Sequence, residues 1–137
     1  MEINWKYTTK VEKDSLDRTE KNLNVEFPKD FKKLIIDCNA GKPSKDCFDI
    51  HNRKECVIDY MIGINDKDTN GIFNTSKMMW NSGLPKYLIP IALDPFGNII
   101  AYKASEGKLS ELIFWDHETN EETYVAKSLN VFITMLY

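Results

Sequence analysis

The stretch from Leu88 to Val125 constrains the fold most, because it has the pattern of four consecutive β-strands. The apolar runs are 88–93, 98–102, 111–116 and 121–125, and clusters of turn-forming residues separate them. Strands joined by such short connections pair as antiparallel neighbours, since parallel pairs need a long crossover. The sequence therefore predicts a largely antiparallel sheet at the centre of the molecule.

The third of these runs is apolar on both of its faces. Leu112 and Phe114 alternate with Ile113 and Trp115, and a strand with this pattern is buried on both sides. Helices must cover the sheet, and 137 residues suffice for one such domain. We predict a single α+β domain over residues 1–137. Its central, largely antiparallel (mixed) sheet is covered by N-terminal, middle and C-terminal helices.

The helix that follows Pro28 has the clearest pattern. Phe31, Leu34, Ile35 and Cys38 fall at helical spacing on one face, and proline suits the first turn. We expect Gly41 to end this helix in the left-handed conformation.

Other elements are predicted from weaker patterns. We expect a helix from Asp14 or Ser15 to about Asn24 with a thin apolar face of Leu16 and Leu23, a helix from 71 or 72 to 81 capped by Asn70, and a C-terminal helix capped by Ser128. Short strands are expected at 48–50 and 57–64, with an edge strand near Ile3, Trp5 and Tyr7.

Composition narrows the class of protein. The formal net charge is −3 and the only arginines are Arg18 and Arg53, whereas nucleic-acid-binding faces are basic. The longest apolar run, 56–64, contains Asp59 and is about half as long as a membrane span. The first six residues lack a signal-peptide core, and three cysteines without a C-x-x-C pair favour reduced thiols. We expect a cytoplasmic protein without membrane spans or cofactors.

Four segments, in order along the chain, resemble the SUKH superfamily of Smi/Knr-type domains. The residues that carry the resemblance are Glu20, Leu23, Val25, Phe27, Pro28, Asp30, Phe31, Lys32, Leu34 and Ile35 with Asn39-Ala40-Gly41, then Tyr87 to Ile100, Ile113 to Glu118, and Val125 to Leu129 with Phe132. Ala40 replaces a glycine of the pattern. Pro95 and Phe96 stand where small residues are usual, so that the 94–98 loop is bulkier.

The resemblance implies a mixed α+β domain that acts by binding proteins. Bacterial members are mostly immunity proteins that neutralise a secreted or contact-delivered toxin, often a nuclease or deaminase. Fungal relatives regulate cell-wall synthesis through protein partners, and the family is not known for catalysis.

Asp116-His117-Glu118 is a run with acid–base character. It raises a remote alternative, a small hydrolase that uses His117, although no motif marks a nucleophile. Asp116 and His117 also suit a hairpin turn in which they hydrogen-bond the backbone. We expect no catalytic residue.

The cysteines raise two further questions. Cys47, Asp49, His51 and Cys56 could be interpreted as metal ligands, but their spacing matches no common zinc pattern. Cys38 lies on an apolar helical face and is interpreted as a core residue. We expect no metal site.

Candidate partner-binding residues are of two kinds. The acidic ones are Asp17 and Glu20 on the first helix and Asp116, Glu118, Glu121 and Glu122 around the last turn. They could occupy the basic cleft of a nuclease, although such residues also suit a solvated face. Met79 and Trp80 could form an adaptable contact surface or one face of a core helix.

We therefore predict a non-catalytic immunity protein whose partner is a cognate toxin domain. It is expected to be a monomer or weak homodimer that binds neither nucleic acid nor membranes. The alternative is a regulatory or scaffolding domain with no toxin partner.

Overall fold

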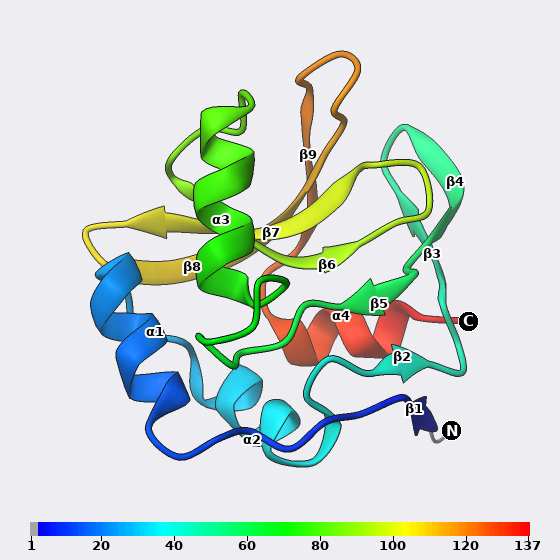
Figure 1. Cartoon of the computed structure of the whole chain (residues 1–137). Helices are drawn as coiled ribbons and strands as arrows, with labels where there is room; N and C mark the ends of the chain where they lie inside the picture. The colour runs from blue at the N-terminus through cyan, green and yellow to red at the C-terminus, as the bar shows by residue number, and fades with distance from the viewer. Residues whose placement is uncertain (1–2) are drawn as a thin grey trace.

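The computed structural model describes residues 3–137, and a five-stranded sheet lies at its centre (Figure 1). The strands are β5 (Tyr60–Met61), β6 (Leu88–Leu93), β7 (Ile99–Ser105), β8 (Lys108–Trp115) and β9 (Glu122–Ala126), paired in that order. Every pair in the sheet is antiparallel, and a parallel bridge joins Glu26 to Lys108 outside the named strands. The predicted antiparallel run of strands is confirmed.

Four helices pack around this sheet, as predicted. They are α1 (Ser15–Leu23), α2 (Lys29–Cys38), α3 (Ile72–Asn81) and α4 (Leu129–Met135). Ser128 caps α4 through its hydroxyl, which accepts a hydrogen bond from the Val131 N–H at 3.2 Å. The single α+β architecture follows from these elements.

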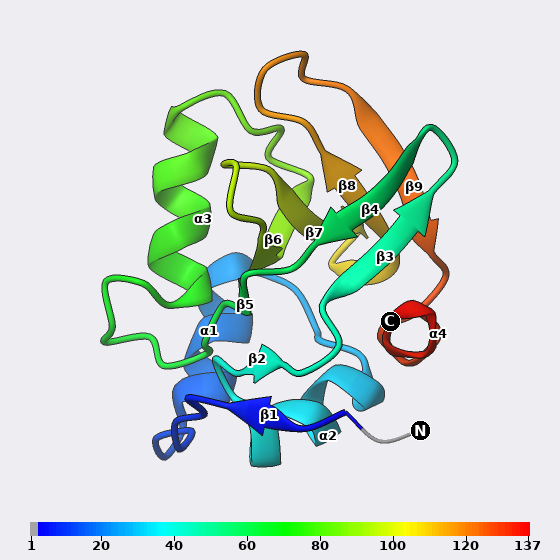
Figure 2. The same ribbon diagram turned by 90° about the vertical axis from the view of Figure 1, so that its right-hand side faces the viewer.

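The sheet is buried on both faces, and β8 shows this directly. Leu112 and Phe114 belong to the larger apolar cluster, which includes side chains of α1, α2 and α4. Ile113 and Trp115 belong to a smaller cluster on the opposite face. Figure 2 shows α3 on one side of the sheet and α4 on the other.

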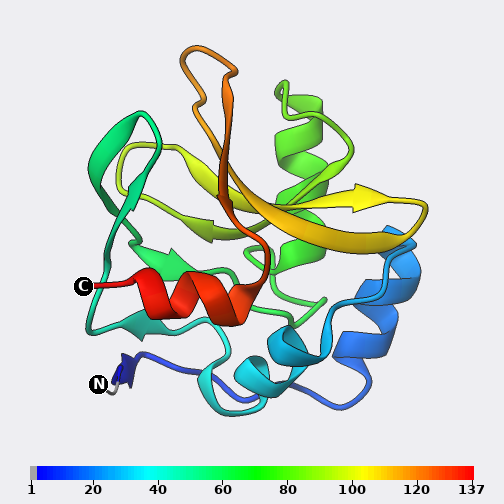
Figure 3. The ribbon, with the colours of Figure 1, turned by 180° about the vertical axis from the view of Figure 1, so that it is seen from behind.

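A hairpin of β3 (Cys47–Ile50) and β4 (Arg53–Val57) also covers the face of the larger cluster. Its Phe48 ring meets the rings of Phe114 and Phe132 edge-on. Figure 3 shows α4 and the short pair β1 (Trp5–Lys6) and β2 (Lys42–Pro43) at the end of the molecule away from the β8–β9 turn.

The strand predicted at 57–64 is wrong as one element, because the chain changes partner within the apolar run. The Ile58 N–H still bonds Asp46 beside β3, whereas the Asp59 N–H bonds the Leu93 carbonyl of β6 at 2.7 Å. The run is therefore divided between the end of β4 and the short β5.

Three details of the helix ends and faces also differ. Gly71, not Asn70, is the N-cap of α3. Ala40 adopts the left-handed conformation (φ 61°) in place of Gly41, whose α-hydrogens face Trp5 and Thr8 closely. On α1 the buried positions are Ser15, Thr19 and Leu23, because the Thr19 hydroxyl bonds the Ile64 carbonyl at 3.1 Å.

Candidate partner-binding groove

Two turns at one end of the sheet are joined by buried side chains. The Asp94 carboxylate accepts hydrogen bonds from the Phe96 and Asn98 N–H groups at 2.8 and 2.7 Å and from the Asn98 amide at 2.9 Å. The Asn98 side-chain oxygen then accepts from the His117 N–H at 3.1 Å. Asp94 and Asn98 are both buried and satisfied. The β6–β7 and β8–β9 turns therefore form one unit.

Asp116 organises the β8–β9 turn. Its carboxylate accepts from the Glu118 and Thr119 N–H groups at 2.8 and 3.2 Å and from the Arg53 guanidinium at 2.7 Å. The Arg53 hydrogen bond is the main reason that the pKa of Asp116 lies below its usual value, and the Glu118 N–H adds to it. The predicted hairpin turn, with Asp116 bonded to the backbone, is confirmed.

The His117 side chain lies against Gly97. Gly97 has φ +91°, and a β-carbon at that position would lie 3.1 Å from His117 Nε2. The same nitrogen is 3.9 Å from the exposed Glu118 carboxylate. Glycine is thus needed here both for the backbone conformation and for the close approach of the imidazole.

A groove of about 270 Å³ lies between these turns and the C-terminal end of α3. We call it the rim groove, and it is lined by Met79, Ser82, Gly97, Ile99, Trp115, His117 and Asn120. Figure 2 shows the three contributing segments at the upper end of the molecule. Segments that are far apart in the sequence therefore share one depression.

Trp115 lines this groove and carries an unsatisfied buried donor. The residue is 7% exposed, and its indole N–H has no hydrogen-bond partner among residues 3–137. By contrast, the Trp80 indole N–H donates to the Leu88 carbonyl at 3.0 Å. An unpaired buried donor costs about 1–3 kcal/mol, and this N–H is buried beneath the groove wall rather than open to the groove.

Exposed side chains of two kinds flank the rim groove. Phe96, next to Gly97, is 72% exposed, and Met78, next to Met79, is 61% exposed. The polar one is Glu118, next to His117, whose side chain is 80% exposed. Aromatic and methionine anchors with a polar rim are typical of protein interfaces.

The predicted residues in this region have different roles. Met79 and Trp80 both pack on the smaller apolar cluster, and Met79 also lines the groove. Glu122 accepts a hydrogen bond from the Tyr87 hydroxyl, and Glu121 accepts one from the Asn52 amide at 3.4 Å. Glu118 and Met79 are thus the predicted residues nearest the groove.

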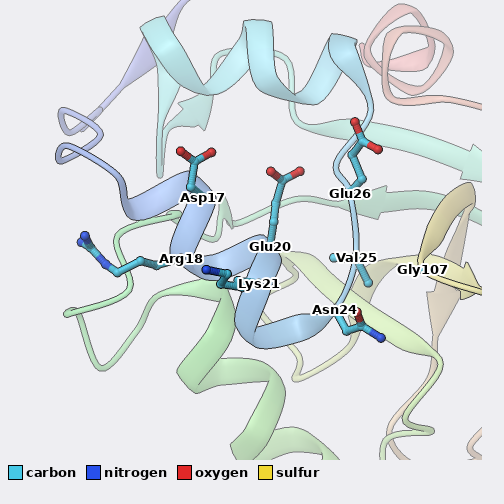
Figure 4. Close-up of a pocket in the computed structure, with 8 residues that line it drawn as sticks. All are labelled: Asp17, Arg18, Glu20, Lys21, Asn24, Val25, Glu26 and Gly107. Carbon is cyan, nitrogen blue, oxygen red and sulfur yellow. The ribbon is translucent and has the colours of Figure 1, made fainter.

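The predicted residues of α1 lie elsewhere, around a second hollow of about 460 Å³ (Figure 4). Asp17 is exposed, while Glu20 accepts from the Phe27 N–H at 2.7 Å and lies 3.4 Å from the Lys32 ammonium. Figure 1 places α1 and the β8–β9 turn at opposite ends. Asp17 and Glu20 therefore do not share a surface with residues 116–122.

The α1 hollow carries both signs of charge. Figure 4 shows the carboxylates of Asp17, Glu20 and Glu26 on one side, while Arg18 points away. Arg18 is bound to Asp66 at 2.7 Å, and Lys21 also lines the hollow. Lys32 lies 3.4 Å from the Glu20 carboxylate and 3.8 Å from that of Glu26. Together with Lys21 it offsets the carboxylates, so the hollow offers no strong field to a charged partner.

The cysteines and helices add further findings. Among residues 3–137, no three His, Cys, Asp or Glu side chains gather as metal ligands. Burial raises the pKa of the Cys38 thiol, with the Asp37 charge as a lesser cause.

The helices of residues 3–137 are too short or too polar to span a bilayer.

Sequence reasoning missed Gly97 and Phe96 as parts of this surface, and it missed the contact between Gly97 and the His117 side chain. Gly97 lines the rim groove, and Phe96 is exposed beside it. A signal for them did exist. Pro95 and Phe96 are bulky where the family pattern has small residues, and such a departure indicates a surface feature particular to this chain.

The chain matches a protein-family model over most of its length. The model of the SMI1/KNR4 family (SUKH-1) matches residues 10–135. No sequence among the curated proteins matches the chain significantly.

Proposed function

This chain belongs to the SMI1/KNR4 family (SUKH-1), and from that membership we propose that it is an immunity protein. In this proposal it binds a cognate toxin domain in the cytoplasm and neutralises the toxin without catalysing a reaction. The rim groove and its flanking side chains form the binding surface.

The exposed Phe96 beside the rim groove is the observation that carries the choice of surface. A phenylalanine that is 72% exposed contributes nothing to the core, and aromatic residues recur among the energetic centres of protein interfaces. The neighbouring turn is held rigid by Asp94 and Asn98, so little ordering is needed on binding.

The acidic side chains support a basic partner. Glu118 is exposed next to the groove residue His117, and Glu121 is exposed on the same turn, toward Asn52. The Asp116 carboxylate is paired with Arg53 and adds little negative charge. Exposed acids would steer a basic nuclease or deaminase toward this end and speed association. A standard interface of about 800 Å² per partner would cover this end without reaching α1.

The test is calorimetric titration against the toxin domain encoded beside the gene, with the toxin activity assayed in parallel. Phe96→Ala should weaken binding at least about 30-fold, as expected for a residue at an energetic centre. Glu118→Lys should slow association and remove part of its salt dependence. Asp17→Lys is the matched control, since it makes the same charge change at the opposite end of the molecule, and should alter affinity less than about threefold.

Each contrary result has a distinct meaning. A loss of affinity for Asp17→Lys with none for Phe96→Ala would move the interface to the α1 hollow. If the wild-type protein neither binds nor inhibits that toxin domain, the immunity proposal fails, and the regulatory scaffold becomes the better account of this family member.

A further inference from the structure

The central sheet ends at β9, which has β8 as its one neighbouring strand in the part of the chain that the structure describes. Figure 3 shows β9 on the near side of the sheet, with no helix or strand drawn across it. At the other edge of the sheet, the Met61 N–H of β5 donates to the Gly41 carbonyl at 2.9 Å. The β9 edge therefore presents backbone groups that a strand from another molecule can pair with.

The ladder between β8 and β9 decides which backbone groups point outward. The Asp116 N–H donates to the Glu121 carbonyl at 3.0 Å, so this pair is hydrogen-bonded. Glu122, Thr123 and Tyr124 occupy the next positions of the ladder, and hydrogen-bonded and non-hydrogen-bonded pairs alternate along antiparallel strands. The N–H and C=O groups of Glu122 and Tyr124 therefore point away from β8.

A bulge ends this alternation after Tyr124. Ala126 rather than Val125 pairs with Leu112 of β8, so Val125 is an extra residue in β9. Both Val125 and Ala126 are buried. The regular part of the free edge is thus short, and its outward-facing residues are Glu122 and Tyr124.

We infer that β9 pairs with β9 of a second copy of this chain, in the antiparallel register that places Glu122 of each copy opposite Tyr124 of the other. Each such pair exchanges two backbone hydrogen bonds, so both outward residues of both copies are used. The two-fold axis passes between the two Thr123 residues, and the same surface meets itself, as in most protein dimers. This inference is independent of the proposed function.

The side chains beside the edge favour a second copy as the occupant. Tyr124 is 53% exposed and, two residues after Glu122, lies on the same face of the strand. The Glu122 carboxylate accepts a hydrogen bond from the Tyr87 hydroxyl and has capacity for a further donor. In the inferred register the Tyr124 side chain of one copy lies beside Glu122 of the other. The two Thr123 side chains meet on the opposite face, and threonine pairs across strands are stabilising.

The dimer should be weak, because the bulge limits the pairing to a short segment. We expect a dissociation constant of about 1 mM, since so small an interface barely offsets the entropy cost of association. Sedimentation equilibrium of the full chain, on both sides of that concentration, measures the constant. In ¹⁵N spectra the Glu122 and Tyr124 amide signals should move downfield with concentration. The Thr123 signal should move less, because its N–H is directed to β8.

Two substitutions of Tyr124 test the register. Tyr124→Lys places an ammonium opposite Glu122 of the other copy and should dimerise at least as tightly as the wild type. Tyr124→Glu places two carboxylates opposite each other and should weaken the dimer about tenfold or more. Asn22→Glu is the matched control for the second variant. It adds the same charge at an exposed position of α1, and the dissociation constant should stay within about twofold.

The contrary results are distinct. A protein that stays monomeric at concentrations well above the expected constant, with unmoved Glu122 and Tyr124 amide signals, would overturn the inference. Equal weakening by Tyr124→Lys and Tyr124→Glu, with tight pairing only between these two variants, would place Tyr124 opposite itself and refute the register. A dimer that is lost in Phe96→Ala and kept in Tyr124→Glu would show that the copies meet at the rim groove instead. Thermal melting of each variant confirms that it is folded, as expected for changes at an exposed side chain.

Discussion

Replacing Gly97 by alanine should reveal how closely the two turns of the rim are coupled. Gly97 has φ +91°, and the added β-carbon would lie 3.1 Å from His117 Nε2. Two costs are therefore expected, one from the backbone conformation and one from displacement of the imidazole. Gly83→Ala is the matched control, since Gly83 has φ +115° and its added β-carbon would meet no atom within 4 Å.

The two costs have different magnitudes. An L-residue in the left-handed region costs about 1–2 kcal/mol, and both variants should lose this amount of unfolding free energy. Moving the half-exposed His117 side chain away from its rotamer adds about 0.5–1.5 kcal/mol, which only Gly97→Ala incurs. The excess should disappear in a His117→Ala background, where nothing remains to be displaced.

Urea denaturation of the four proteins in this cycle, together with Gly83→Ala, gives the necessary free energies. Equal losses for Gly97→Ala and Gly83→Ala, with no coupling to His117, would refute the packing of the imidazole on Gly97. A Gly83→Ala variant as stable as the wild type would refute the argument from backbone conformation.

Three further predictions concern other parts of the molecule. The pKa of Asp66 lies below its usual value chiefly because Arg18 donates a hydrogen bond to its carboxylate. The ionised carboxylate therefore stabilises the folded protein. This contribution is fully present above the unfolded pKa of about 3.9 and is lost as the pH falls from there through the lower folded pKa. Asp66→Asn should therefore lower the unfolding free energy at pH 6 and have a smaller effect at pH 2, as urea titrations at both pH values would show; an equal loss at both would contradict this. Tyr102→Phe should leave the melting temperature unchanged or raise it, because the buried hydroxyl has no partner among residues 3–137, and a fall of several degrees would argue against this. Ser128→Ala should cost about 1 kcal/mol of unfolding free energy, from the lost cap of the Val131 N–H, and Ser128→Asp should restore most of it.

The central strands and the four helices could be predicted because their signals are local. Leu112 and Phe114 face one apolar cluster and Ile113 and Trp115 the other, as the alternation requires. The antiparallel pairing could be predicted from the short connections between the strands, without knowledge of distant contacts.

The failures arose where a distant part of the chain decides the local structure. The run 57–64 is continuous in hydrophobicity, yet its pairing changes at Ile58 and Asp59 because two different strands compete for its backbone. Thr19 has the polarity of a solvent-facing residue, but its hydroxyl finds the Ile64 carbonyl across the core. No local pattern encodes such pairings.

The candidate site was predictable in its parts and not in its arrangement. Acidic residues and Met79 were identified, but α1 and the β8–β9 turn lie at opposite ends, so no single acidic surface forms among the described residues. The groove itself depends on the contact between Gly97 and the His117 side chain. Only tertiary packing brings these two residues together.

The internal hydrogen bonds of the two rim turns have an evolutionary consequence. Asp94, Asn98 and Asp116 hold the turns from within, while Pro95, Phe96 and the positions after His117 project outward. Substitution at the outward positions leaves the supporting bonds untouched. Related chains can therefore diversify what they recognise at this end while the scaffold beneath stays constant, much as hypervariable loops do on a fixed framework.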